Sequence, residues 1–131
     1  MTDPLLAWHF VSGPLPGVLR DGRPVPADGE WLEHEGKIVP CESGLHASVR
    51  AVDALRYAPG QIVCRVELDG EIVKHDSDKI VGCRRRVLWR ADAVDVLRAF
   101  ACDRALSVAN MWEMPDVVRQ YLTTRDPSLR G

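Results

Sequence analysis

Residues 61–68 read QIVCRVEL and carry the clearest strand signal in the chain. The apolar positions on one side of the alternation are Ile62, Cys64, Val66 and Leu68. A repeat of two matches the way in which successive side chains of a strand point to opposite faces, so the stretch predicts a strand with one buried face. We therefore expect a sheet in this part of the chain.

The flanking stretches extend this sheet. Asp69-Gly70 is a turn signal, after which residues 71–74 resume an extended run. Residues 79–89, KIVGCRRRVLW, predict another strand, bent at Gly82 because glycine weakens a strand interior. Residues 5–11, LLAWHFV, are apolar and aromatic and predict a buried first strand.

Between these strands the chain is less regular. Residues 12–30 are rich in glycine and proline, which predicts a long loop, and such loops are commonly functional or mobile. Residues 31–34 and 37–39 predict a short hairpin. Residues 49–57 have apolar side chains at helical spacing and predict a short helix that ends before Pro59-Gly60.

From Ala91 the pattern changes to a helical period. Asp92 is a candidate cap for a helix with apolar Val96, Leu97, Phe100 and Ala101, and Pro115 marks the start of a second helix. The expected fold class is α+β, with a small twisted, mainly antiparallel sheet and a C-terminal helical pair. We expect a single domain over residues 1–131, with a β-rich core in 1–90 and the helices of 91–126 packed on it.

Composition excludes several classes of protein. The chain has 131 residues, is 46% hydrophobic and has a formal net charge of −2, which fits a globular protein and argues against a broad nucleic-acid surface. Its apolar stretches are short, which predicts neither a membrane span nor a signal peptide. The four cysteines form no CxxC pair, so free thiols in a reducing cytoplasm are expected.

The histidines are the first candidates for a site. His9 lies inside an apolar strand, His46 follows Gly44 in the segment GLHAS, and His34 and His75 lie among charged residues. Cys41, His46 and His9 could share a metal ion, but none shows the close ligand pairing that structural zinc sites use. We therefore predict no metal site.

The run Arg84-Arg85-Arg86 is the strongest charge feature. On a strand Arg84 and Arg86 share one face, so they could present two guanidinium forks to a phosphate or carboxylate. Alternatively, the run is a solvated edge strand protected by charge from aggregation. Trp89 and Trp112 are expected to be packing residues.

The order of these segments resembles the ADP-ribosyltransferase fold. The matching pieces are AWHF around His9, GLHAS around His46, AVDALRYAPG, QIVCRVELDG and KHDSDKIVGCRRRVLW, about the first seventy per cent of the chain. The resemblance implies a cleft for NAD. The ligand-binding residues predicted from it and from the charge pattern are His9, His46, Ser48, Tyr57, Arg84 and Arg86. The first segments are also similar to those of small phage and prophage proteins.

The resemblance departs from the family at the last strand. Transferases carry a glutamate there that stabilises the positive charge of the ribosyl group, whereas CRRRVLW places arginines at that point. We therefore predict a phage-type accessory protein, a binding module without an assigned catalytic residue, holding a phosphate-bearing or nucleotide-like ligand or a protein partner.

Two alternatives stay open. One is an active NAD-dependent ADP-ribosyltransferase, or an enzyme like the RNA 2′-phosphotransferases, with NAD as its cofactor. The other is a pure protein–protein interaction module that uses the glycine- and proline-rich loop and the C-terminal helices.

Overall fold

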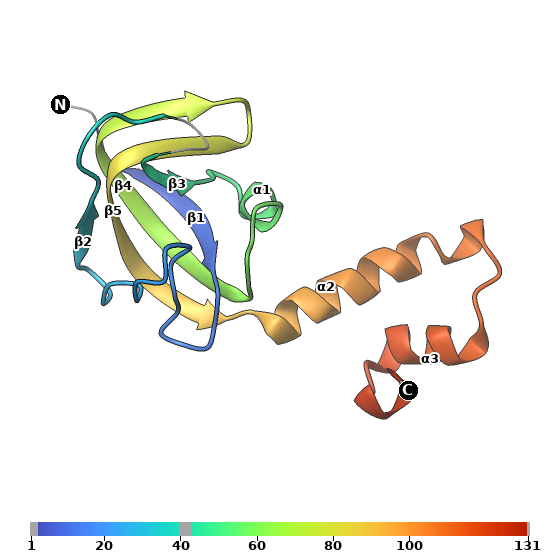
Figure 1. Ribbon diagram of the computed structural model, residues 1–131. Helices are drawn as coiled ribbons and strands as arrows, with labels where there is room; N and C mark the ends of the chain where they lie inside the picture. The colour runs from blue at the N-terminus through green and yellow to red at the C-terminus, as the bar shows by residue number, and fades with distance from the viewer. Residues whose placement is uncertain (1–2, 40–42, 131) are drawn as a thin grey trace. The chain divides into compact units, whose positions relative to one another are not determined.

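The computed structural model describes residues 3–39 and 43–130. The chain divides into two compact units, residues 1–92 and 93–131. The first unit holds a mainly antiparallel sheet and one short helix, labelled in Figure 1. Its elements are β1 (Leu5–Val11), β2 (Trp31–Glu33), β3 (Leu45–Ala47), α1 (Ala51–Leu55), β4 (Ile62–His75) and β5 (Lys79–Asp92). The α+β class is confirmed.

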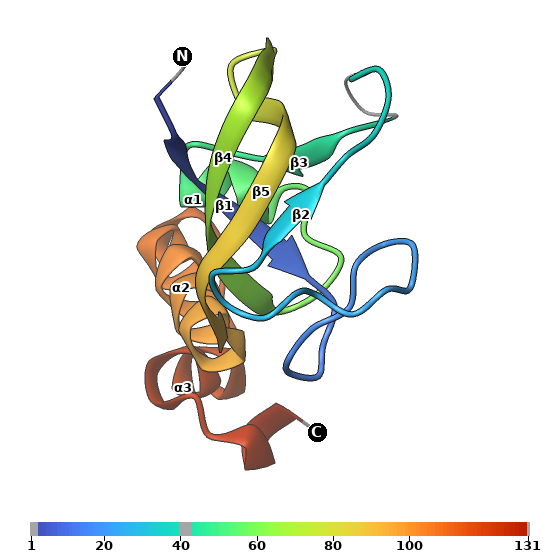
Figure 2. The ribbon, with the colours of Figure 1, turned by 90° about the vertical axis from the view of Figure 1, so that its left-hand side faces the viewer.

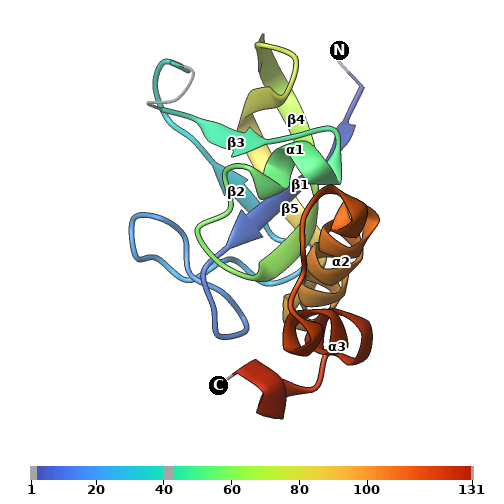
Figure 3. The ribbon, with the colours of Figure 1, turned by 90° about the vertical axis from the view of Figure 1, so that its right-hand side faces the viewer.

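The two long strands β4 and β5 form the centre of the sheet, and they run side by side in Figure 2. The strand order is β1-β4-β5-β2, and β3 also pairs with β5. Trp8 in β1 and Ser48 after β3 exchange two backbone hydrogen bonds, of 2.7 and 2.9 Å. This bridge curls the sheet back on itself, so that β1 and β3, separated in the chain, lie together. Helix α1 lies beside β1 (Figure 3).

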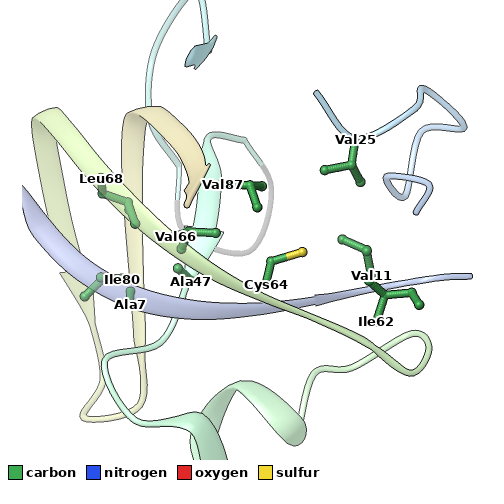
Figure 4. Packing of buried hydrophobic residues seen from close by; sticks show 10 residues of the cluster. All are labelled: Ala7, Val11, Val25, Ala47, Ile62, Cys64, Val66, Leu68, Ile80 and Val87. Carbon is green, nitrogen blue, oxygen red and sulfur yellow. The ribbon is translucent and has the colours of Figure 1, made fainter. Parts of the chain in front are cut away.

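The alternation read in residues 61–68 is confirmed. Ile62, Cys64, Val66 and Leu68 are each at most 1% exposed. They form one core with side chains from the neighbouring strands, and Val25 approaches Val11 from the 12–30 segment (Figure 4). Burial of this apolar surface is the main driving force for the fold of the first unit.

The predicted turn at Asp69-Gly70 is wrong, because β4 continues through it to His75. The pairing with β5 shifts register between Asp69 and Ile72, as at a β-bulge. Gly70 has a φ of 74° there, and a Cβ at this position would stand 2.5 Å from the Cys83 sulfur. The glycine thus serves an irregularity within the hairpin, and the reversal comes after His75.

The predicted hairpin of residues 31–39 is also wrong. Trp31–Glu33 pairs with Arg84–Arg86 of β5, and Val39 forms a single bridge with Ser43. The free edge of β5 supplies the hydrogen-bonding partners that a local hairpin would otherwise provide. Helix α1 matches the prediction for residues 49–57 but covers only its middle.

The 12–30 segment has no long regular element, as predicted, yet its path is held by Arg90 of β5. The Arg90 guanidinium donates hydrogen bonds to the backbone oxygens of Pro16 (2.8 Å) and Pro26 and to the Asp28 carboxylate (3.0 Å). The Arg90 side chain is only 10% exposed. These contacts fix both halves of the segment to the end of β5.

The second unit contains α2 (Val94–Ser107), a 3-10 turn (Ala109–Met111), α3 (Asp116–Thr124) and a final 3-10 turn (Pro127–Arg130). Helix α3 begins just after Pro115, as predicted, and packs against α2. Asp92 ends β5 rather than capping α2, whose N-cap residue is Ala93. Val96, one of the apolar positions from which this helix was predicted, is 70% exposed.

That the helices pack on the β-rich part stays a prediction. Among the described helices, none has the length and apolar character needed to cross a membrane.

Candidate functional site

A cavity of about 410 Å³ opens between β1, β3, β5, the end of α1 and the 12–30 segment. Four of the six residues predicted to bind ligand line it: His9, His46, Ser48 and Tyr57. They come from three separate stretches of the chain, and the Trp8–Ser48 bridge brings two of these stretches together. The charged residues that also line the cavity are Arg20, Asp21, Arg23, Lys79 and Arg85.

Arg84 and Arg86, predicted to bind the ligand together with His9 and His46, do not line this cavity. They share a face of β5, as predicted, but it is the face opposite the cavity, and Arg85 faces the cavity instead. The alternation along a strand tells which side chains go together, whereas the face that turns inward depends on the register of the whole sheet.

Arg84 and Arg86 are held on the outer face by Trp31 and by carboxylates. Their guanidinium carbons lie 4.3 and 4.7 Å from the centre of the Trp31 ring. Arg84 pairs with Glu33 at 3.1 Å and with Asp69 at 3.4 Å, and Arg86 pairs with Glu67 at 3.0 Å. Both cations therefore have protein counter-charges.

Arg85 is different, because it is 6% exposed and has no carboxylate within ion-pair distance among the described residues. Its Nη1 donates a hydrogen bond of 2.6 Å to the backbone oxygen of His46. Burial lowers the pKa of Arg85 to about 10, so the side chain still carries its charge at neutral pH. A buried charge without an opposite charge is costly, which makes this position the natural point of contact for an anion.

His9 and Ser48 bring further hydrogen-bonding groups to the cavity. No described residue forms a hydrogen bond with the His9 ring or with the Ser48 hydroxyl, although Ser48 is only 2% exposed. Burial, and then the charge of Arg85, hold the pKa of His9 well below its usual range. At neutral pH the ring is therefore uncharged, with one nitrogen as donor and the other as acceptor.

His46 lies on β3 and is partly buried. Burial first, then the charges of Lys79 and Arg85, lower the pKa of His46 to about 4, against a hydrogen bond to the Gly44 backbone that raises it. The ring is neutral at physiological pH. Both imidazoles thus enter the cavity uncharged, next to a permanently charged guanidinium.

Tyr57 joins three segments at the rim of the cavity. Its hydroxyl donates a hydrogen bond of 2.7 Å to Asp78, and the Lys79 ammonium lies 4.3 Å from its ring centre. Arg20 Nη2 donates a hydrogen bond of 3.0 Å to the Tyr57 backbone oxygen. The end of α1, the start of β5 and the 12–30 segment therefore meet at this residue.

The charge balance of the cavity is positive. The described residues that line it include no glutamate, and their single aspartate, Asp21, forms an ion pair of 2.7 Å with Arg23. Glu67 of β4 pairs with Arg86 on the outer face. The arrangement is suited to binding an anion.

Other candidates from the sequence lie elsewhere. His34 is within 3.3 Å of the Lys37 backbone oxygen and His75 is 3.4 Å from Asp76, and neither lines the cavity. Within residues 3–39 and 43–130 no cluster of three or more histidine, cysteine or acidic residues could hold a metal. Cys64, Cys83 and Cys102 are free thiols, and Cys41 lies outside the described residues.

Sequence reasoning missed Arg85, Lys79 and Arg20. For Arg85 the signal was present, since alternation in the arginine run leaves the middle residue alone on its face. Arg20 and Lys79 gave no local signal, because a loop and a strand end bring them to the cavity only in the folded chain.

A comparison with protein families gives a match over residues 26–99 to the family described as "Domain of unknown function (DUF7666)". The matched stretch holds β2 to β5 and α1, and with them His46, Ser48, Tyr57, Lys79 and Arg85 of the cavity. Comparisons with curated proteins and with solved structures found no match. Because the matched residues make up more than half of the chain, the protein belongs to the DUF7666 family.

Proposed function

We propose that the β-rich unit is a binding module whose cavity holds a small phosphate-bearing or nucleotide-like ligand, with Arg85 in contact with the anionic group. The observation that carries this proposal is the buried Arg85 guanidinium, whose only hydrogen bond to a described residue goes to a backbone oxygen. A bound phosphate would supply the opposite charge and the acceptors that the guanidinium lacks.

The remaining lining fits such a ligand. Ser48 and His9 offer hydrogen-bonding groups at the cavity wall, and Leu19 and Leu32 offer apolar surface. Small-molecule sites typically combine apolar walls with a few convergent polar groups in about 300–1,000 Å³, and this cavity of about 410 Å³ falls in that range. Lys79 and Arg20 at the rim would attract an anion from solution.

The proposal includes an ADP-ribosyltransferase-like arrangement of the sheet, in which His9 and the His46–Ser48 segment flank one cleft. Support comes from the position of these residues around a single cavity. The absence of a glutamate among the described lining residues favours binding over ribosyl transfer, because no carboxylate would stabilise the developing cation. NAD is then a candidate ligand rather than an assigned cofactor, and a phage or prophage origin stays a prediction.

A protein partner is the second candidate, and the exposed apolar side chains of the second unit favour it. Met111, Trp112 and Val117 are 78%, 52% and 52% exposed. Exposed apolar side chains that cluster are typical of interaction sites. In this alternative the cavity would be incidental.

Titration calorimetry with NAD, ADP-ribose, AMP and inorganic phosphate tests the ligand proposal. A cavity ligand whose free concentration is one hundred times its dissociation constant should raise the free energy of unfolding by about 2.7 kcal/mol. Arg85→Met should weaken binding at least about tenfold, since a charge-assisted hydrogen bond is lost. Arg84→Met, the matched control on the outer face, should leave the affinity unchanged.

Two results would contradict the proposal. One is that none of the four compounds binds, and the other is that Arg85→Met binds as tightly as the unchanged protein. Release of nicotinamide from NAD, measured in parallel, would instead favour the transferase alternative.

A further inference from the structure

His9 and His46 reach the same cavity from two strands, and Arg85 reaches it from a third. Both rings are uncharged at neutral pH, whereas Arg85 carries one full positive charge. Besides the charged side chains at its rim, the cavity thus combines one buried fixed cation, Arg85, with two groups that can become cations. This combination determines which anion the wall can neutralise.

The other charged or titratable groups around the imidazoles are few. Lys79 and Tyr57 lie at the rim, and Arg23 is paired with Asp21. Arg20 is exposed and bonded to the Tyr57 backbone oxygen. Cys64 and Glu30 line a small hollow behind His9 and Arg85. Of the carboxylates around the cavity, Asp21 is paired with Arg23, Asp78 accepts the hydrogen bond of the Tyr57 hydroxyl, and Glu30 lies in the small hollow.

Resting on the function proposed above, we propose that His9 and His46 make the cavity selective for a doubly charged oxyanion, such as the terminal phosphate of a phosphomonoester, by taking up one proton when the anion binds. Arg85 alone matches a singly charged group, such as a phosphodiester or a carboxylate. A second negative charge at the same place needs a second positive charge, and the nearest groups that can acquire one are the imidazoles.

The His9 ring is suited to this role because no described residue already forms a hydrogen bond with it. Once protonated, it donates from both nitrogens, and either can bond to an anion oxygen. The charge of Arg85 helps to keep both rings neutral in the free protein. A bound dianion would offset that charge and so favour protonation.

The binding step is balanced simply. The free protein, a dianion and one proton from solution give a complex with an imidazolium, and no covalent bond forms or breaks. Linkage then requires the affinity for a dianion to rise as pH falls below the pKa of the imidazole in the complex. For one proton the affinity rises about tenfold per pH unit, until the pH falls to the pKa that the same imidazole has in the free protein.

Inorganic sulfate and methanesulfonate provide the test, because both are tetrahedral oxyanions and neither titrates between about pH 5 and pH 8, the range in which histidine responds. Dissociation constants are measured by calorimetry across this range, with proton uptake obtained from buffers of different ionisation enthalpy. Sulfate should bind more tightly at low pH with uptake of up to one proton. Methanesulfonate should bind with neither effect.

Variants assign the proton. His9→Gln and His46→Gln keep a polar amide in place of the imidazole, and at least one of them should remove most of the pH dependence while sulfate still binds. His75→Gln, whose ring lies outside the cavity, is the matched control and should leave the dependence unchanged. Nitrogen NMR of the imidazoles, with and without saturating sulfate, should show that one ring becomes protonated at a higher pH in the complex.

The outcomes separate the two proposals. Sulfate that binds through Arg85 without proton uptake would overturn the inference but leave the anion site standing. A pH dependence that persists in both histidine variants would overturn it as well. If none of the anions and none of the phosphate-bearing compounds binds, both the inference and the proposed function fail.

Discussion

The Arg85 guanidinium donates a hydrogen bond of 2.6 Å to the backbone oxygen of His46, and this contact joins β5 to β3 beside the cavity. The backbone pairing places His46 opposite Val81, four residues before Arg85. The side chain therefore reaches back along the sheet to find its acceptor. That acceptor is a dipole and carries no net charge, so it offsets only a small part of the electrostatic cost of burying the guanidinium.

Removing this charge should not weaken the free protein. For Arg85→Met we expect the free energy of unfolding to be unchanged or raised by up to about 2 kcal/mol, since lost desolvation cost offsets the lost hydrogen bond. Urea denaturation in the absence of ligand measures it. A loss of more than about 2 kcal/mol would mean that Arg85 stabilises the native sheet by itself.

Stability should fall on acidification through His9 and His46. Unfolded imidazoles protonate near pH 6.5, whereas the native rings stay neutral, with the pKa of His46 at about 4. Below about pH 6.5 the unfolded state binds more protons, so the free energy of unfolding decreases as pH falls and levels off for His46 near pH 4.

Each imidazole contributes less than about 1.4 kcal/mol per pH unit to the slope of the free energy of unfolding against pH. Solvent around the partly exposed His46 ring reduces its contribution further. Urea titrations at several pH values measure the slope. His46→Gln should make it shallower, and an unchanged slope in that variant would contradict the assignment.

Gly44, which lines the cavity, should not tolerate a side chain. Its φ is 114°, and a Cβ there would stand 2.4 Å from Val81 Cγ1. We expect Gly44→Ala to cost about 2–3 kcal/mol from backbone strain plus the forced shift of Val81. Gly36→Ala has a similar φ of 99° but nothing within 4 Å, so it isolates the backbone cost at about 1 kcal/mol. Thermal unfolding of the pair measures the difference, and equal costs would argue against the steric contact.

Arg90 should control the order of the 12–30 segment. Arg90→Met removes hydrogen bonds to two backbone oxygens and to Asp28, at an expected cost of about 2–4 kcal/mol. Hydrogen exchange in residues 12–30 should rise more than elsewhere in the sheet. Arg23→Met breaks an ion pair whose side chains are 60% and 52% exposed, and should leave the stability and the hydrogen exchange nearly unchanged. Uniform exchange changes in Arg90→Met would count against a local role.

Local pattern was sufficient for the strands that carry the core. The two-residue period in 61–68 identified the buried face of β4, and the boundaries read for the first strand agree with β1, because both stretches are apolar enough to need burial whatever surrounds them. Four of the predicted ligand residues also meet at one cavity. Whether they bind a ligand is a prediction still to be tested.

The errors came from contacts between distant segments. Asp69-Gly70 has the residues of a turn, but β5 continues to pair with the chain beyond it, so the glycine is used in an irregularity of the ladder. Likewise Trp31–Glu33 finds its partner more than fifty residues away, on the free edge of β5. Neither result can be read from the residues nearby in the sequence, because the hydrogen bonds that decide it are made with strands distant in the chain.

The arginine run has a consequence for how the gene can change. Its middle residue faces the interior and its neighbours face outward, so loss of a single codon between Gly82 and Arg84 would exchange the two sides of the following strand. Two guanidiniums would then enter the core and one would leave it. Descendants of this chain should therefore accept insertions in the turn after His75, whereas an insertion or deletion across the arginine triplet must comprise an even number of residues.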